Sequence, residues 1–396
     1  MLEDSFQTCF EAGEIIMAVN RKFASPLESP YGLNFLLEGI GIEKAEIIFH
    51  SPKEPDENDG ADLFLISLKK KEPSAVMEAV TKLSDNPYVL FAEPDYPEEL
   101  HLISNDPLYS FLWGTQRVDA PSAWEYTTGS AEVTVGVIDS GIDAAHPDIR
   151  NNMWVSPDRR LANGWNFAEN NRNSTDTNGH GTHVAGTIGA VGNNGIGITG
   201  ICWNIKIAAL RFGLNTASAV AAIDFANRFD IPILNASWGG PFYSRALKYA
   251  IDHYNGLFIA SAGNDGANND LEPMFPASFD SANLISVAAA NPNNELAGFS
   301  NYGARSVDIA APGTNILSLG LYGSYSPQNG TSMAAPHVAG AAALLKSYFP
   351  GLSPLALKSI ILSSAVRHKS LAGRVVTGGL LNANAMFRLA SFLLER

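Results

Sequence analysis

The chain of 396 residues contains only two cysteines, Cys9 and Cys202, which lie far apart in the sequence. Two such cysteines make neither a disulfide framework nor a cysteine-based metal site. No apolar run approaches the roughly 20 residues that a membrane-spanning helix needs, so we expect no membrane span. Hydrophobic residues make up 46% of the chain and charged residues 17%. This composition can fill a large core, which argues against disorder.

Positive charge is also scarce, because 26 Lys and Arg stand against 40 Asp and Glu, for a net charge of −14. The excess of acid is concentrated in residues 1–101, which hold 8 Lys and Arg and 20 Asp and Glu. Nucleic-acid binding requires a basic face, so that class of function is excluded. No signal peptide is visible, since the first 30 residues are interrupted by Glu3, Asp4, Glu11 and Glu14.

A small α+β domain is predicted for the N-terminal quarter of the chain. Strands are expected at 13–20, 45–49, 62–68 and 88–93, helices at 29–39 and 73–83, and an exposed loop at 51–60. This order of elements is typical of a ferredoxin-like fold. The acidic, proline-rich stretch at 93–99 is expected to be an extended linker. Since the length also fits two domains, we place them at 1–101 and 102–396.

From about residue 130 onward, apolar runs alternate with helical patterns. The runs are apolar on both faces, as buried parallel strands are, and lie at 133–138, 206–210, 231–234, 257–260 and 284–289. The helical patterns lie at 181–191, 217–229, 243–254, 334–348, 353–364 and 382–393. Such alternation predicts an α/β fold with a doubly wound, mainly parallel sheet. Sites in such sheets lie at the carboxyl ends of the strands.

Two polar residues stand where such sites are expected. Asp139 directly follows the strand at 133–138. This placement suits a carboxylate that orients an imidazole, although turn aspartates are also common there. His180 lies between two glycines at a helix entry, where its ring can face an opening. His183 would be its partner in a metal pair, but no H-E-x-x-H pattern or nearby cysteine supports one. We therefore interpret His183 as a buried structural histidine.

Two further residues complete the set that acyl hydrolysis requires. Asn264 follows the strand at 257–260, and its amide is a neutral donor suited to an oxyanion, although an ordinary asparagine-rich loop has the same appearance. Ser332 precedes a run of small residues with helical character. Proline is tolerated in the first turn of a helix, so Pro336 places Ser332 near a helix start, where the dipole favours negative charge. A nucleophile, base, orienting acid and oxyanion donor are then all present.

The order Asp, His, Ser differs from that of the α/β-hydrolases, and the serine lacks their G-x-S-x-G motif. Three blocks instead resemble the signatures of the subtilisin-like serine proteases. They are Val-Ile-Asp-Ser-Gly at 137–141, His-Gly-Thr-His-Val-Ala-Gly at 180–186 and Gly-Thr-Ser-Met-Ala-Ala-Pro at 330–336. The resemblance covers roughly residues 105–393, with all three blocks in the family's order.

This resemblance implies a serine endopeptidase that forms an acyl-enzyme intermediate. Asp139 would be the orienting acid, His180 the general base, Ser332 the nucleophile and Asn264 an oxyanion donor, with the Ser332 N–H as the second donor. Two alternatives stay open. One is a catalytically silent relative that only binds peptides, which the presence of all four residues argues against. The other is an esterase-type hydrolase with the same triad.

Residues 1–101 resemble the prosegment of secreted subtilisins, a ferredoxin-like folding aid and inhibitor. The resemblance implies a precursor that cuts itself, and we expect cleavage between residues 99 and 104, near His101 or Leu102. The partners would be peptide or protein substrates and the chain's own prosegment. Intracellular subtilisins typically carry much shorter prosegments, so a secreted or cell-surface location is expected.

The segment Ser237-Trp238-Gly239-Gly240 resembles the family's substrate-binding edge, where a peptide pairs as an added strand. Its glycines allow the substrate backbone to approach closely. Trp238 either forms a wall of the pockets further from the scissile bond or is a packed core residue. Met274 stands near the base of the primary pocket, where the family often has a glycine. We expect it to shift preference from aromatic to mid-sized apolar residues.

A structural Ca²⁺ site is also implied by the resemblance. Its residues would be Asp148, Gly192, Asn194, Ile196 and Ile198. A carboxylate, an amide oxygen and turn carbonyls are suitable ligands for this hard cation, although Asn-Gly loops are common turns in any protein.

Overall fold

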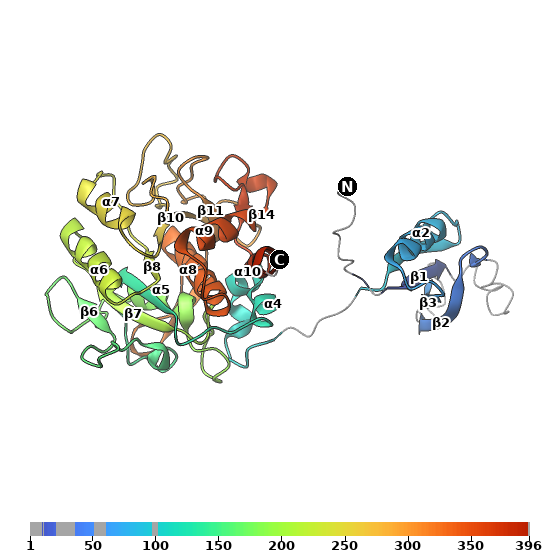
Figure 1. Ribbon diagram of the computed structural model, residues 1–396, viewed down its shortest axis with the longest axis horizontal. Coiled ribbons are helices and arrows are strands. Elements are labelled where there is room, and N and C mark those ends of the chain that lie inside the picture. Colours follow the sequence, from blue (N-terminus) through green and yellow to red (C-terminus); the bar gives the residue numbers. More distant parts are fainter. Residues whose placement is uncertain (1–9, 11, 21–35, 51–60, 97–101, 395–396) are drawn as a thin grey trace. The chain divides into compact units, whose positions relative to one another are not determined.

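The computed structural model describes residues 10, 12–20, 36–50, 61–96 and 102–394 (Figure 1). The chain divides into two compact units, Met1–Leu100 and His101–Arg396. Within the described ranges, no helix is both long enough and apolar enough to cross a bilayer.

The described residues of the first unit form a four-stranded antiparallel sheet that packs against helix α2 (Pro73–Ser84). Its strands are β1 (Glu14–Asn20), β2 (Ile42–His50), β3 (Ala61–Leu68) and β4 (Val89–Pro94), in the order β2-β3-β1-β4. Helix α2 begins with a proline at its first turn and buries Val76, Ala79 and Leu83 against one face of the sheet. The helix expected at 29–39 falls mostly, and the loop at 51–60 entirely, outside the described residues.

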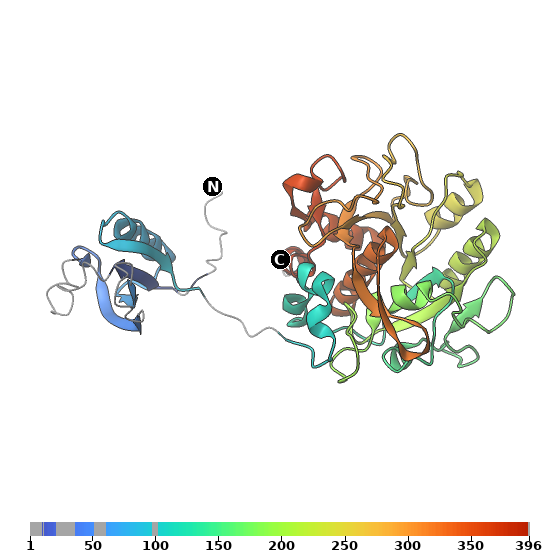
Figure 2. The same ribbon diagram turned by 180° about the vertical axis from the view of Figure 1, so that it is seen from behind.

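The second unit is built on a nine-stranded sheet, seen from opposite sides in Figures 1 and 2. Every neighbouring pair is parallel except β14 with β15, which confirms the doubly wound, mainly parallel fold. The sheet order is β14-β15-β11-β10-β9-β8-β5-β7-β6, and the strands are β5 (Thr134–Asp139), β6 (Gly164–Asn166), β7 (Lys206–Arg211), β8 (Ile233–Ala236), β9 (Leu257–Ser261), β10 (Leu284–Ala290), β11 (Ile309–Pro312), β14 (Val366–Arg367) and β15 (Gly379–Leu380).

Helices cover both faces of this sheet. On one face lie α5 (His180–Gly189), α8 (Thr331–Tyr348), α9 (Pro354–Ser363) and α10 (Ala383–Leu394). The other face is covered by α6 (Thr216–Arg228) and α7 (Arg245–Asp252), which lie together at one side in Figure 1. The remaining elements are α3 (Trp113–Arg117), α4 (Ala120–Trp124), the hairpin β12 (Ile316–Leu319) and β13 (Tyr325–Gln328), and 3₁₀ turns at Tyr109–Phe111, Arg150–Asn152, Leu321–Gly323 and Lys369–Leu371.

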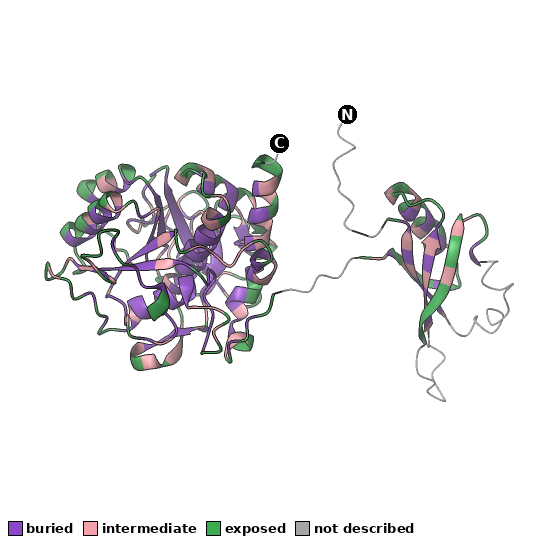
Figure 3. Ribbon diagram, turned by 60° about the horizontal axis from the view of Figure 1, so that its bottom comes forward, coloured by how far each residue is buried: buried purple, intermediate pink, exposed green. Residues whose placement is uncertain are grey.

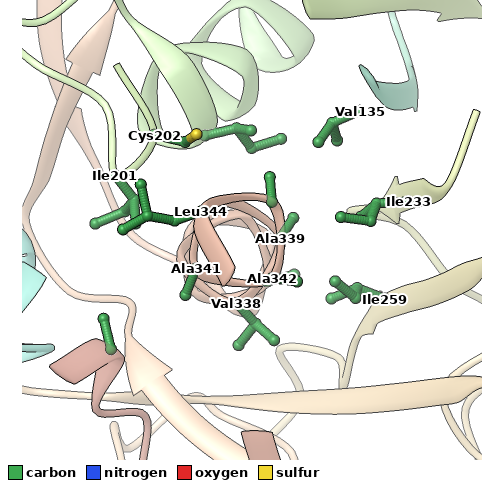
Figure 4. Close-up of a cluster of buried hydrophobic side chains, with 14 of the residues drawn as sticks. Val135, Ile201, Cys202, Ile233, Ile259, Val338, Ala339, Ala341, Ala342 and Leu344 are labelled. Atoms are coloured by element: carbon green, nitrogen blue, oxygen red, sulfur yellow. The ribbon is translucent and has the colours of Figure 1, made fainter. Parts of the chain in front are cut away.

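The strands are buried on both faces because their side chains alternate between two cores. In β5, Val135 and Val137 join the core under α5 and α8, whereas Ile138 joins the core under α6 and α7. Figure 3 shows this central region as buried. The small residues of α8 let that helix lie close to the sheet, and Ala339 and Ala342 face Ile233 and Ile259 in Figure 4. The first turn of α8 is thereby held at the strand ends.

Candidate active site

The predicted acid and base are in direct contact. Asp139 is the last residue of β5 and is almost fully buried, while half-buried His180 is the first residue of α5. His180 Nδ1 lies 2.8 Å from Asp139 Oδ1, which also accepts a hydrogen bond from the Ser140 N–H. The helix approaches the strand this closely because residue 181 is a glycine. A methyl group on Gly181 would lie 2.2 Å from a backbone oxygen of the turn after β5.

Charge around His180 favours the protonated ring. Burial alone lowers its pKa, but the hydrogen bond and charge of Asp139, followed by the charge of Asp176, outweigh that effect. The pKa of His180 is therefore raised from its ordinary value. A neutral imidazole is needed to accept a proton, so the base is available at pH values above this raised pKa.

Asp176 is a residue that the sequence motifs did not point to. This buried carboxylate accepts hydrogen bonds from the N–H groups of Asn178, Gly179 and Thr182 at the start of α5, as well as from two hydroxyls. One of the hydroxyls belongs to Ser140, next to Asp139. These donors hold the pKa of Asp176 below its ordinary value although burial opposes them. An aspartate shortly before a helix-entry histidine is a capping signal that the sequence does contain.

Ser332 is the second residue of α8, so the prediction that it lies near a helix start is confirmed. Placing Pro336 in the first turn was wrong, because it is the sixth residue of the helix. The missing N–H of Pro336 leaves the Ser332 carbonyl without its usual donor in the following turn. The Ser237 hydroxyl donates to this carbonyl instead, at 2.9 Å.

The Ser332 hydroxyl itself donates to the Ser237 carbonyl oxygen at 3.0 Å. Among the described residues, no hydrogen bond joins it to the ring of His180. Catalytic hydrogen bonds of free enzymes are often long and tighten only when substrate is bound. The structure thus joins Asp139 directly to His180 and places Ser332 at the start of a second helix, without a direct bond between base and serine.

Asn264 lies beside the start of α8 with its amide oriented by other residues. Its Oδ1 accepts hydrogen bonds from the Thr331 N–H at 2.8 Å and from the Thr331 hydroxyl at 3.0 Å, which turns Nδ2 the other way. A methyl group on Gly330 would lie 3.6 Å from both Asn264 Nδ2 and Ser332 N. The amide nitrogen of Asn264 and the backbone nitrogen of Ser332 therefore lie on the same side of Gly330, where Met333 Sδ is equally near. Gly330 has φ +150°, a conformation that favours glycine.

The predicted substrate edge continues from β8 as Ser237–Gly240. Gly240 and Phe275 exchange backbone hydrogen bonds of 2.9 and 2.8 Å in an isolated antiparallel bridge. A methyl group on Gly239 would lie 3.3 Å from Met274 Cγ, and one on Gly263 would lie 3.4 Å from Met274 Cε. Half-buried Met274 thus packs between the predicted edge and the residue preceding Asn264.

Trp238 has the contacts of a packed residue, and its role as a wall of the substrate pockets stays a prediction. Its ring is half-buried and packs on Phe212 with the ring centroids 4.7 Å apart. Its indole N–H donates to the Ile138 carbonyl at 2.7 Å. The side chain is therefore anchored in the fold and still has one exposed part.

Comparisons with known proteins agree with this geometry. A model of the subtilase family matches residues 130–385. An alkaline protease of Alkalihalobacillus alcalophilus is 32% identical over 88% of this chain and 90% of its own, and subtilisin Savinase of Lederbergia lenta is 36% identical over 70% of this chain and 99% of its own. A solved protease structure from Pseudoalteromonas arctica, 29% identical, superposes with a TM-score of 0.65 over 73% of this chain and 99% of its own.

The chain belongs to the subtilase family. A thermophilic serine proteinase of Bacillus sp. (strain AK1) is 38% identical over 68% of this chain and 67% of its own. The protein is accordingly a subtilisin-like serine endopeptidase. The α/β fold with its additional N-terminal sheet agrees with that assignment.

The residues predicted to bind calcium lie together in this subtilase. Asp148 is fully buried and accepts hydrogen bonds from Asn194 Nδ2 at 2.9 Å, from the Ile198 N–H at 2.9 Å and from the Tyr325 hydroxyl at 3.2 Å. Burial is the main cause that raises the pKa of Asp148, and the charge of Asp106 adds to it. Asp106 was not predicted as part of this site.

Asp106 binds the same loop from the other side. Its carboxylate accepts hydrogen bonds from the N–H groups of Asn193, Asn194 and Gly195 at 2.8–3.0 Å. The loop therefore holds two buried carboxylates close together. The part of the chain that the structure describes contains no group of three or more His, Cys, Asp or Glu side chains that could hold a metal ion. A cation here would need amide and backbone oxygens as additional ligands.

The interpretation of His183 as a structural histidine is confirmed. It is fully buried, and its Nε2 lies 3.0 Å from the Ile316 carbonyl and 3.1 Å from the Ser326 carbonyl. Burial lowers the pKa of His183 to about 4, so the ring is neutral at neutral pH and donates its proton to these oxygens. The ring ties α5 to the hairpin of β12 and β13.

Proposed function

We propose that this subtilase cleaves peptide bonds with Ser332 as nucleophile, His180 as general base and then acid, and Asp139 as the orienting acid. The main support is the 2.8 Å contact between Asp139 and His180 at adjoining strand and helix ends. It fixes which ring nitrogen carries the proton, because Nδ1–H donates to the carboxylate and Nε2 is left to accept a proton.

The reaction follows from these positions. The Ser332 oxygen attacks the carbonyl carbon of the scissile bond while its proton passes to His180 Nε2. Asn264 Nδ2 and Ser332 N, which both lie beside Gly330, are the proposed donors to the carbonyl oxygen as it becomes negative. As the C–N bond breaks, His180 gives its proton to the leaving amine and the acyl group stays on Ser332. Water then attacks the ester in the same way, releasing the acid and restoring the serine.

A comparison of wild type with Ser332→Ala tests this function. The variant should neither process its own N-terminus nor hydrolyse casein, with a loss of about 10⁴–10⁶ in rate. A variant that processes itself as fast as wild type contradicts the mechanism. If wild type hydrolyses small esters but no peptides, the esterase alternative holds instead. If it binds peptides without cleaving either class, the protein is a silent relative.

We further propose that residues 1–101 are a prosegment that inhibits the catalytic domain, 102–396. Support comes from the face of the first sheet opposite α2, where Phe49, Leu63, Ala18 and Phe91 form one cross-strand row. The two ends of the row are exposed, Phe49 by 51% and Phe91 by 44%, whereas Leu63 is half-buried and Ala18 is fully buried between them. Large exposed apolar side chains that share one face can mark a protein interaction surface. The export implied by the resemblance to secreted subtilisins stays a prediction.

Cleavage of the prosegment is expected between residues 99 and 104. N-terminal sequencing of the processed enzyme tests this boundary directly. A mature chain that starts after Asp106 contradicts it, because that start lies beyond the range 99–104. Such a chain would also lack the carboxylate that binds the loop at 193–195.

A structural Ca²⁺ is proposed for the loop around Asp148. Buried Asp148 and Asp106 lie beside the loop at 192–198, and their carboxylates, the side-chain oxygen of Asn194 and the backbone oxygens of Gly192, Ile196 and Ile198 are ligand types that suit a hard cation. Asn194 presents Nδ2 to Asp148, so its amide would have to turn to offer the oxygen. The charge of Asp106 raises the pKa of Asp148, a repulsion that a bound cation would relieve. Bound there, the ion would tie Asp148 to the loop at 192–198 and stabilise the fold.

A further inference from the structure

Two consecutive residues just after β8 form hydrogen bonds at or next to the proposed nucleophile and the proposed acid. Ser237 exchanges hydrogen bonds with Ser332, and Trp238 donates to the residue preceding Asp139. Both were singled out as parts of the substrate edge, a role that requires only their backbone and the exposed part of the indole. Their buried contacts point toward the catalytic groups instead.

The contact of Ser237 with Ser332 follows from the sequence of α8. A helix interior normally satisfies the carbonyl of residue i with the N–H of residue i+4, and for Ser332 that residue is Pro336, which has no N–H. The Ser237 hydroxyl supplies the missing donor at 2.9 Å. It is itself held by the side-chain amide of buried Asn235, which donates to it at 2.9 Å. The backbone of the nucleophile is thereby fixed to the end of β8.

Trp238 holds the end of β5 in a similar way. Its indole N–H donates to the Ile138 carbonyl at 2.7 Å, while the Phe212 N–H donates to the carbonyl of the next residue, Asp139, at 3.0 Å. The rings of Phe212 and Trp238 pack on each other, so the two donors belong to residues that are in contact. The carbonyls of Ile138 and Asp139 are thus each held by a donor. One donor follows β8 and the other follows β7, the two strands that neighbour β5.

We propose that the Ser237–Trp238 pair positions the triad by fixing the separation between Asp139 and Ser332, in addition to binding substrate. The proposal rests on the proposed function, because it requires these two residues to be the acid and the nucleophile. Trp238 acts through Ile138 and Ser237 through the Ser332 carbonyl, so both are positioning residues. Small misplacements of reacting groups cost large factors in rate, which makes such contacts matter for turnover.

Trp238→Phe tests the acid side, because phenylalanine keeps an aromatic ring and removes the N–H. We expect kcat to fall by about tenfold, because a small misplacement of the acid costs a large factor in rate, with KM within about twofold of wild type. The acid limb of kcat/KM should also move to lower pH. The titratable groups that face His180 are Asp139, Asp176 and His183. Among them Asp139 raises the pKa of His180 most strongly, so a looser bond to Asp139 should lower that pKa.

The matched control is Trp124→Phe, which removes an indole N–H donated to the Ile201 carbonyl at 2.9 Å in the core under α4. It should change the melting temperature and leave the pH profile in place. If Trp238→Phe lowers only the melting temperature or only raises KM, and leaves the acid limb unchanged, the positioning role is wrong.

Ser237→Ala tests the nucleophile side. Removing its hydroxyl leaves the Ser332 carbonyl without a donor, so kcat should fall several-fold. The acid limb of the kcat/KM profile should stay at the same pH as in wild type. A loss confined to KM would overturn the proposal for this residue. The proposed function is tested separately by Ser332→Ala, whose inactivity does not depend on either result.

Discussion

At the scale of single residues, the proton held between Asp139 and His180 governs the chemistry. The 2.8 Å contact favours the tautomer with the proton on Nδ1, and in the proposed mechanism it also stabilises the imidazolium that forms when Ser332 gives up its proton. The raised pKa of His180 is the cost of that stabilisation, because the base is then protonated over a wider range of acid pH. In the proposed mechanism, the Asp139 carboxylate therefore affects both the rate of hydrolysis and the pH range in which His180 can act as a base.

Asp139→Asn should separate these two effects. The amide can present its N–H to Nδ1, which favours the wrong tautomer, so kcat should fall by about 10⁴. Loss of the negative charge lowers the pKa of His180 toward its ordinary value, so the residual activity should persist to lower pH than in wild type. Measuring kcat/KM from pH 4 to 9 checks both. An unchanged acid limb would show that another group controls the titration.

Met274→Gly should change which residue is accepted before the scissile bond. Met274 fills the space between Gly239 and Gly263, so wild type is expected to prefer Leu and Met over Phe and Tyr. Opening that space should reverse the ratio of kcat/KM values, by up to about 10–200-fold for a change in pocket size of this order. A matched series of peptides differing only at this residue measures it. Wild type preferring Phe or Tyr would contradict the assignment of the pocket.

At the scale of elements, the site lies where strand ends and helix starts meet. Periodicity predicted β5, β7, β8, β9 and β10 within two residues at each end, because buried parallel strands are continuous apolar runs. The helices α5, α6, α7, α8, α9 and α10 were also predicted, since small and apolar residues recur at helical spacing. Short elements such as β6, β14 and β15 give too few residues for any period to show.

Parts of the site could not be read from the sequence for a related physical reason. Motif positions identified Asp139 and His180, whose contact follows from strand and helix ends meeting. Asp106 acts through hydrogen bonds to backbone N–H groups of the distant loop at 193–195, and such contacts leave no spacing pattern. Asp176 instead binds N–H groups at the start of α5, a local pattern that the motifs did not point to. The bond from Trp238 to Ile138 crosses 100 residues and depends on the rotamer of one ring.

The loop that follows α5, at 192–198, should make the stability of the enzyme depend on calcium. Adding Ca²⁺ at about 100 times its Kd should stabilise the enzyme by about 2.7 kcal/mol, and a chelator should reverse the change. The melting temperature of the inactive Ser332→Ala protein measures this without self-digestion. Asp148→Asn should lose the dependence on calcium. Identical melting curves with calcium and with chelator would contradict the site.

At the scale of the whole molecule, the acidic first unit and the nearly neutral second unit have separate cores. The first unit leaves apolar residues on the face of its sheet opposite α2, including Phe49 and Phe91. If that face binds the catalytic domain, one charge placed on it should weaken inhibition without unfolding the sheet, because the buried core lies on the other face.

Phe91→Glu should therefore speed the appearance of full proteolytic activity after self-cleavage. Removing apolar contact and burying a charge are both unfavourable at an interface, so the released prosegment should inhibit at least tenfold less well. Lys70→Glu, on an exposed residue away from this row, is the control. Equal inhibition by wild-type and Phe91→Glu prosegments would show that the row is not the inhibitory surface.

The central claim is that Ser332 is the nucleophile activated by His180. A phenylmethylsulfonyl fluoride reaction tests it most directly, because the attacking oxygen displaces fluoride and keeps the sulfonyl group. Peptide mapping by mass spectrometry should find one adduct per molecule, on Ser332, forming in step with the loss of activity and only above the pKa of His180. Full inactivation with the adduct on another residue, or continued peptide hydrolysis after Ser332 is fully labelled, would contradict the account.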